Sequence, residues 1–71
     1  MGVEELLRNA IAQVAEARRI VARQEQQIAH LREIGSLTGE AEKLLDNFTK
    51  TLTALEDYER DLRRLAERKV S

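Results

Sequence analysis

His30 is the single histidine among 71 residues, and its imidazole is the side chain best suited to move a proton or accept a phosphoryl group near neutral pH. The sequence offers it no partners for metal chemistry. There is no cysteine to complete a zinc ligand set, and no Glu-x-x-His motif of the kind that binds two metals inside a helical bundle. The glycines at positions 2, 35 and 39 form no phosphate-binding loop. We therefore predict no catalytic, metal-binding or cofactor-binding residue, and we expect that the protein is not an enzyme.

Basic residues gather in two places, and a basic face on a helix can bind nucleic acid. Arg18, Arg19 and Arg23 form one cluster, and five of the residues in 60–69 form the other. Acidic residues interleave with both clusters, and the 12 basic and 13 acidic residues leave a net charge of −1. This balance argues against a general nucleic-acid binder or a protein held on an anionic membrane.

The elements that carry these side chains are two long helices. The chain has no proline, 35% charged residues and 3% aromatic residues, which is typical of long solvated helices. Apolar residues recur at alternating spacings of three and four, the pattern of a coiled-coil seam. In the first half the stripe comprises Val3, Leu7, Ala10, Val14, Ala17, Val21, Gln24, Ile28 and Leu31. In the second half the predicted stripe comprises Ala41, Leu44, Phe48, Thr51, Leu55, Tyr58, Leu62 and Leu65.

The five residues 35–39 predict a bend between the helices. Gly35 can adopt the left-handed conformation that closes a helix, and Thr38 is a suitable N-cap for the next one. Glu40 places negative charge on the first turn of the second helix. The whole chain, 1–71, is therefore predicted to be one all-α unit, an antiparallel two-helix hairpin. Its helices cover about 3–34 and about 38–69, with the turn at about 35–38.

Folding the halves together predicts a register for the seam. Ile28 is expected to pack against Phe48, Val21 against Leu55, and Val14 against Leu62. Gln24 and Thr51 then form one polar layer, which we interpret as a device that selects one alignment over its neighbours. On the flank of the seam, the same register places Arg18 opposite Glu59.

A lone hairpin of this size buries little apolar surface, and further apolar residues lie beside the predicted seam. They are Leu6, Ile11, Ile20, Ile34, Leu45 and Leu52. A two-stranded coil cannot cover so wide an apolar face, so we predict that these six residues form an oligomer interface. The expected assembly is a homodimer with two-fold symmetry, a four-helix bundle. A helix of a different protein is the alternative occupant of this surface.

Three resemblances accompany this reading. The stretch Arg19-Ile20-Val21-Ala22-Arg23-Gln24 and the turn region 35–45 resemble short, mostly uncharacterised bacterial proteins built as Arg/Glu/Ala-rich helical hairpins, which implies a hairpin fold and no activity. A small dimeric hairpin with basic residues is similar in architecture to Rop-type RNA-binding proteins. Ala29-His30-Leu31-Arg32-Glu33 on a first helix resembles the phosphotransfer hairpin of histidine kinases. However, Leu31 stands where that family has an acidic residue, and no proline follows Arg32.

The function that we predict is a non-enzymatic interaction or assembly module, a homodimeric bundle with no cofactor. A Rop-like nucleic-acid-binding regulator is the alternative, and phosphotransfer through His30 is a third hypothesis, against the simpler reading of a solvated surface histidine. Glu4 and Glu5 are unlike the basic start of a signal peptide, and no apolar run is long enough to span a bilayer. We expect a soluble cytoplasmic protein.

Overall fold

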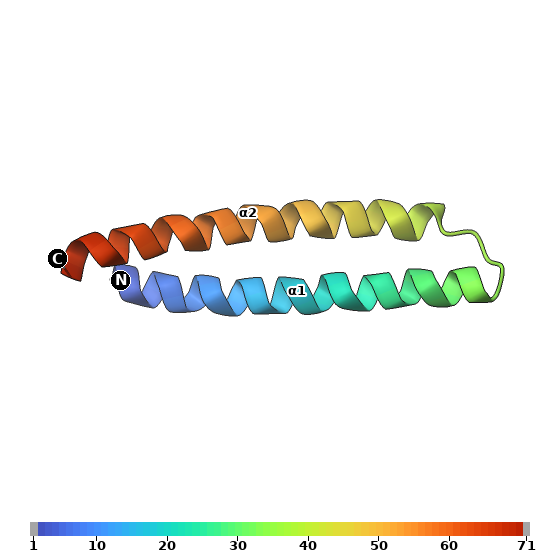
Figure 1. Cartoon of the computed structure of the whole chain (residues 1–71), viewed down its shortest axis with the longest axis horizontal. Coiled ribbons are helices and arrows are strands. Elements are labelled where there is room, and N and C mark those ends of the chain that lie inside the picture. The colour runs from blue at the N-terminus through green and yellow to red at the C-terminus, as the bar shows by residue number, and fades with distance from the viewer. Residues whose placement is uncertain (1, 71) are drawn as a thin grey trace.

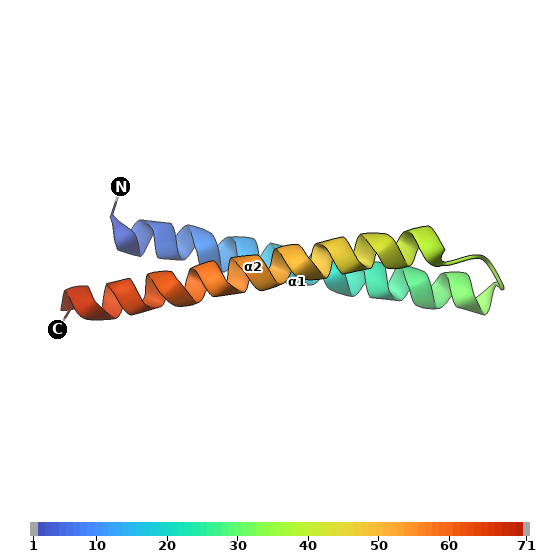
Figure 2. The same ribbon diagram turned by 90° about the horizontal axis from the view of Figure 1, so that it is seen from above.

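The protein is an all-α hairpin of two long helices, which confirms the predicted fold class. The computed structural model describes residues 2–70. Helix α1 spans Val3–Glu33 and helix α2 spans Gly39–Val70, and they lie antiparallel along most of their length (Figure 1). The hairpin measures 56 × 18 × 14 Å. The helices cross at a shallow angle (Figure 2), as in coiled coils.

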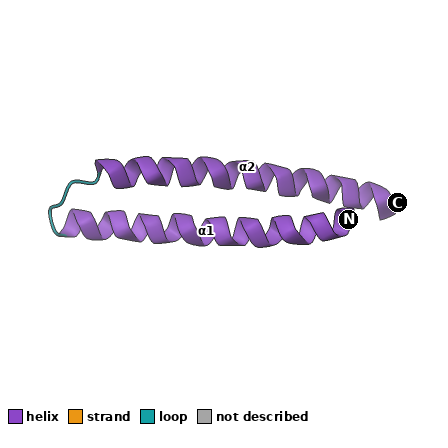
Figure 3. Cartoon of the chain, turned by 180° about the vertical axis from the view of Figure 1, so that it is seen from behind, coloured by secondary structure: helices purple, strands orange, loops and turns teal. Residues whose placement is uncertain are grey.

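Helix α1 ends at the bend in the way predicted from Gly35. Gly35 has φ of 72°, the left-handed conformation. Its N–H donates to the carbonyl of Arg32 at 3.1 Å, and the N–H of Ser36 donates to the carbonyl of Leu31 at 2.9 Å. These two bonds are the Schellman motif, which satisfies carbonyls that the helix end leaves without partners. The chain then crosses to α2 in a short loop (Figure 3).

Thr38 directly precedes α2, at the predicted N-cap position. Its carbonyl accepts the N–H of Glu42 at 2.8 Å, the first helical hydrogen bond. The Thr38 hydroxyl donates to Oε2 of Glu42 at 3.2 Å. Glu40 and Glu42 both lie in the first turn, where the partial positive charge of the helix end stabilises carboxylates.

On α1 the seam follows the predicted stripe. Ala10, Val14, Ala17 and Ile28 are buried, and Val14 is only 2% exposed. The other stripe positions, Val3, Leu7, Val21, Gln24 and Leu31, are half-buried. Alanine at two of the four buried positions allows the helix backbones to approach closely.

On α2 only half of the predicted stripe lies in the seam. Leu62 is buried, and Ala41, Phe48 and Leu55 are half-buried, as predicted. The prediction is wrong for the other four residues of the stripe, which are exposed: Leu44, Thr51, Tyr58 and Leu65. Their places in the seam are taken by the residues one position later, all half-buried: Leu45, Leu52, Glu59 and Ala66. The α2 seam therefore reads 41, 45, 48, 52, 55, 59, 62 and 66.

The alignment of the helices also differs from the predicted one. Gln24 Nε2 donates to the carbonyl of Ala41 at 2.9 Å. Thr51 is ten residues from Ala41, about 15 Å along α2 at 1.5 Å per residue, and it is exposed. The predicted layer of Gln24 with Thr51 is therefore wrong.

The physical reason lies at the bend. Helix α2 begins well inside the end of α1, and its C-terminal end passes beyond the start of α1 (Figure 1). We infer that the pairing is displaced by one heptad from the predicted one. Ile28 then lies level with Ala41, Val21 with Phe48, and Val14 with Leu55.

Candidate interaction surface

The two flanks of the seam differ in chemistry. On one flank the helices are joined by ion pairs. Arg18 Nη2 lies 2.9 Å from Oε2 of Glu56, and Arg32 Nη2 lies 2.7 Å from Oε1 of Glu42. Each of these residues directly follows a seam position, which is where antiparallel coils place complementary charges. Arg18 therefore does not pair with Glu59 as predicted. Glu59 instead accepts from Nε of Arg63 at 2.8 Å.

The other flank is made by the positions that directly precede the seam residues 7, 14, 21 and 28 on α1 and 45, 52, 59 and 66 on α2. Its apolar members recur at multiples of seven residues: Leu6 and Ile20 on α1, Ile34 directly after the end of α1, and Leu44, Tyr58 and Leu65 on α2. We call these six residues the apolar flank. Ile34 is 63% exposed and Leu65 is 50% exposed. Leu37, in the bend, is 96% exposed.

The six residues predicted as an oligomer interface fall into three groups. Leu6, Ile20 and Ile34 belong to the apolar flank. Leu45 and Leu52 lie in the intrachain seam, so they are already partly covered by α1. Ile11, 39% exposed, lies on the same side as Arg18. Leu44, Tyr58 and Leu65 take the place of Leu45 and Leu52 on the outer surface. Sequence reasoning missed them because it placed them in the seam.

The basic residues are largely balanced by neighbouring carboxylates. Besides Arg18 and Arg32, other arginines of the described residues form ion pairs within their own helices. These pairs are Arg19 with Glu16 at 3.1 Å, Arg60 with Asp57 at 2.7 Å, and Arg63 with Glu59 at 2.8 Å. All these arginines are more than half exposed, so each pair stabilises the fold by less than about 1 kcal/mol. Their charge is nevertheless neutralised locally, which weakens the case for a basic nucleic-acid face.

His30 is exposed on α1, and its carbonyl accepts the N–H of Ile34 at 3.2 Å near the helix end. Its position is open to solvent, as a phosphoacceptor requires. No cluster of three or more His, Cys, Asp or Glu side chains in the described part of the chain could hold a metal ion.

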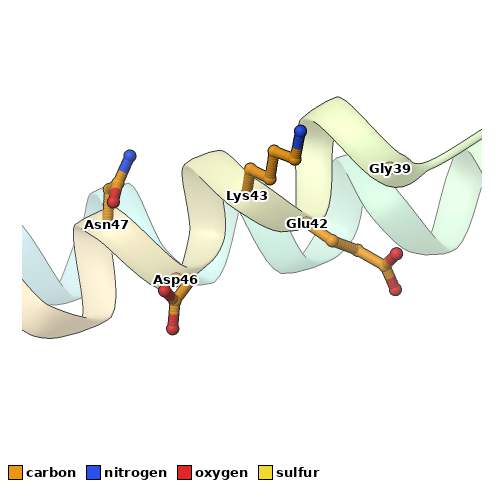
Figure 4. Close-up of a pocket in the computed structure, with 5 residues that line it drawn as sticks. All are labelled: Gly39, Glu42, Lys43, Asp46 and Asn47. Atoms are coloured by element: carbon orange, nitrogen blue, oxygen red, sulfur yellow. The ribbon is translucent and has the colours of Figure 1, made fainter.

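The surface depression at the start of α2 does not form a ligand site. It is lined by Gly39, Glu42, Lys43, Asp46 and Asn47. Figure 4 shows Lys43 and Asn47 pointing to one side of α2, and Glu42 and Asp46 to the other. Their charges are also engaged, because Lys43 pairs with Glu40 at 3.6 Å and Asp46 pairs with Lys50 at 2.9 Å. Diverging, paired side chains give a small ligand no convergent polar contacts.

Neither helix, over the residues that the structure describes, has an apolar stretch that would cross a membrane. Comparison of the chain with protein-family models, with curated proteins and with solved structures found no match. The apolar flank is therefore the surface from which a function can be argued.

Proposed function

We propose that this protein is a non-enzymatic assembly module that dimerises through its apolar flank to form a four-helix bundle. The observation that carries the proposal is the recurrence of Leu, Ile or Tyr along one side of both helices, beside a seam whose other side is charged. Exposed apolar stripes of this kind mark surfaces that bind another protein.

The thin core of a single hairpin supports this proposal. Among the described residues, the buried side chains are Ala10, Val14, Ala17, Ile28 and Leu62. Two of these five are alanines. The one phenylalanine, Phe48, is half-buried and Tyr58 is 45% exposed. Two helices bury one narrow stripe each, whereas four helices enclose a core on all sides.

The energy available from the apolar flank is of the right size. Completing the burial of a half-exposed Leu, Ile or Tyr side chain contributes roughly 1 kcal/mol, half of the usual value for full burial. Four such side chains on each of two chains, Ile34, Leu44, Tyr58 and Leu65, give on the order of 8 kcal/mol, to which the half-buried Leu6 and Ile20 add less. Part of this gain offsets the freedom that two chains lose on association.

Sedimentation equilibrium across micromolar concentrations tests the proposal. We expect the wild-type chain to sediment as a dimer and Leu44→Glu to sediment as a monomer, because a carboxylate on the apolar flank would be buried without a partner. Thr53→Glu is the matched control, since Thr53 is exposed on α2 away from this flank and should leave the dimer intact. A wild-type chain that remains a folded monomer at these concentrations would contradict the proposal.

Rop-like RNA binding is the weaker alternative, since ion pairs engage Arg18, Arg19, Arg32, Arg60 and Arg63. A mobility shift of labelled RNA that disappears as salt rises would favour it. Phosphotransfer through His30 stays a separate hypothesis, which mass spectrometry after incubation with a phosphodonor would test.

A further inference from the structure

The flank of α1 carries a pattern that reads the same in both directions. Positions 6, 13, 20 and 27 are seven residues apart on one side of α1, and position 34, the C-cap, continues the spacing directly after the helix. They read Leu, Gln, Ile, Gln, Ile, so that apolar residues and glutamines alternate. The pattern is symmetric about Ile20. Leu6 and Ile34 are its outer members, with Gln13 and Gln27 between them and the centre.

A two-fold dimer interface must be self-complementary, since residue i of one chain contacts residue j of the other and the reverse. When two copies of α1 lie antiparallel with Ile20 on the two-fold axis, each apolar residue meets an apolar residue and each glutamine meets a glutamine. Sliding the two helices by seven residues places Gln13 against Ile20 and Gln27 against Leu6, which buries glutamine amides against apolar side chains and is unfavourable. Sliding them by fourteen residues moves the two-fold axis to Gln13 or Gln27 and restores the match over only three positions.

We propose, building on the proposed dimer, that the partner is a second copy of this chain docked with α1 antiparallel to α1 and the bends at opposite ends. Leu6 then contacts Ile34 of the partner subunit, and Gln13 contacts the partner's Gln27. Ile20 contacts the partner's Ile20 at the two-fold axis. Glutamine pairs on this surface can satisfy each other through amide hydrogen bonds.

Charges beside the flank match in the same register. Glu16 and Arg23 lie on the outer side of it, at positions symmetric to within one residue about Ile20. Glu16 is engaged by Arg19, and its side chain is 56% exposed. Arg23, by contrast, has no carboxylate within ion-pair distance among residues 2–70. In the proposed dimer Arg23 faces Glu16 of the partner subunit, twice by symmetry.

The same axis accounts for the exposed bend. Val21 lies level with Phe48 in the inferred seam, so the two-fold axis passes α2 near Phe48. Tyr58 is ten residues beyond Phe48, and Gly39, where α2 begins, is nine residues before it. The partner's bend, which contains the 96% exposed Leu37, therefore lies level with Tyr58, which is 45% exposed.

The absence of cysteine from the chain makes single-cysteine cross-linking a direct test. With a short bis-maleimide, Ile20→Cys should give a covalent dimer, since the residue faces itself. Gln13→Cys and Gln27→Cys should each remain uncross-linked alone, because each lies about 21 Å from its own copy along the helix at 1.5 Å per residue. An equal mixture of the two variants should cross-link. The mixture tests the register even if a cysteine at position 20 perturbs the interface.

Two results would overturn the proposal while leaving the dimer itself intact. Cross-linking of Gln13→Cys alone would show that the two-fold axis lies at residue 13, with the helices slid by fourteen residues. Cross-linking of Ser36→Cys would show that the two bends lie at the same end, with α1 against the partner's α2. If the wild-type chain sediments as a monomer, the proposed function fails instead, so the two failures are distinguishable.

Discussion

Gln24 reaches across the seam and donates a hydrogen bond from Nε2 to the main-chain carbonyl of Ala41, 2.9 Å away. Gln24 is half-buried in the seam, and all the remaining seam residues of α1 are apolar. Because the acceptor belongs to the backbone of α2, this bond depends on the axial alignment of the helices and not on the side chain at position 41. Gln24 therefore fixes the axial alignment of the helices through this bond and not through the predicted contact with Thr51.

Gln24→Ala should lower the free energy of unfolding by about 1 kcal/mol, the usual net value of such a hydrogen bond. Thr51→Ala should change it by a few tenths at most, because Thr51 is exposed and alanine has the higher helix propensity. Urea denaturation followed by helical circular dichroism measures both, with exposed Gln26→Ala as the control. If Thr51→Ala proves the more damaging change, the predicted Gln24–Thr51 layer must be reinstated.

The hydrophobic pattern predicted the hairpin but not its register, for a reason visible on α2. The stripe that contains Leu44, Thr51, Tyr58 and Leu65 and the stripe one residue later, with Leu45, Leu52, Glu59 and Ala66, are both mostly apolar. Either could pack against α1 with similar burial. Apolar spacing alone therefore cannot choose between them.

Charge could have made that choice. The observed register pairs Arg18 with Glu56 and Arg32 with Glu42, whereas the predicted register matched only Arg18 with Glu59. The charge pattern could not predict that α2 begins well inside the end of α1. This offset depends on the path of residues 34–38, and the sequence predicts a turn there but not the direction of that turn.

Gly35→Ala should destabilise the hairpin by about 1 kcal/mol, because φ of 72° strains any residue with a Cβ atom. Gly39→Ala is the matched control. Its φ is not in the left-handed region, and an added Cβ would meet nothing within 4 Å. Alanine there should be neutral or slightly stabilising. Thermal melts at equal concentration compare the two, and equal melting temperatures would mean that the Schellman motif contributes little.

Leu62→Ala should cost about 3 kcal/mol, since Leu62 is 5% exposed and its loss leaves a cavity in the seam. Leu65→Ala, three residues later on the same helix, should cost no more than about 1 kcal/mol because Leu65 is 50% exposed. The two variants remove the same atoms, so the difference between their losses reports how deeply each side chain is buried within one hairpin. Urea denaturation at a concentration too low for the proposed dimer measures both, and similar losses would place Leu65 in the seam.

Arg18→Glu should weaken the hairpin by about 1 kcal/mol or less at low salt, because it replaces an attraction to Glu56 with a repulsion at an exposed position. The double variant Arg18→Glu with Glu56→Arg should recover most of that loss, since it restores the pair with reversed polarity. The recovery should shrink as salt screens the charges. Arg19→Glu is the control, because Arg19 pairs with Glu16 in its own helix, so Glu56→Arg should not rescue it. A double-mutant cycle with no coupling between positions 18 and 56 at low salt would place these residues apart. The register of the whole hairpin would then need to be redrawn.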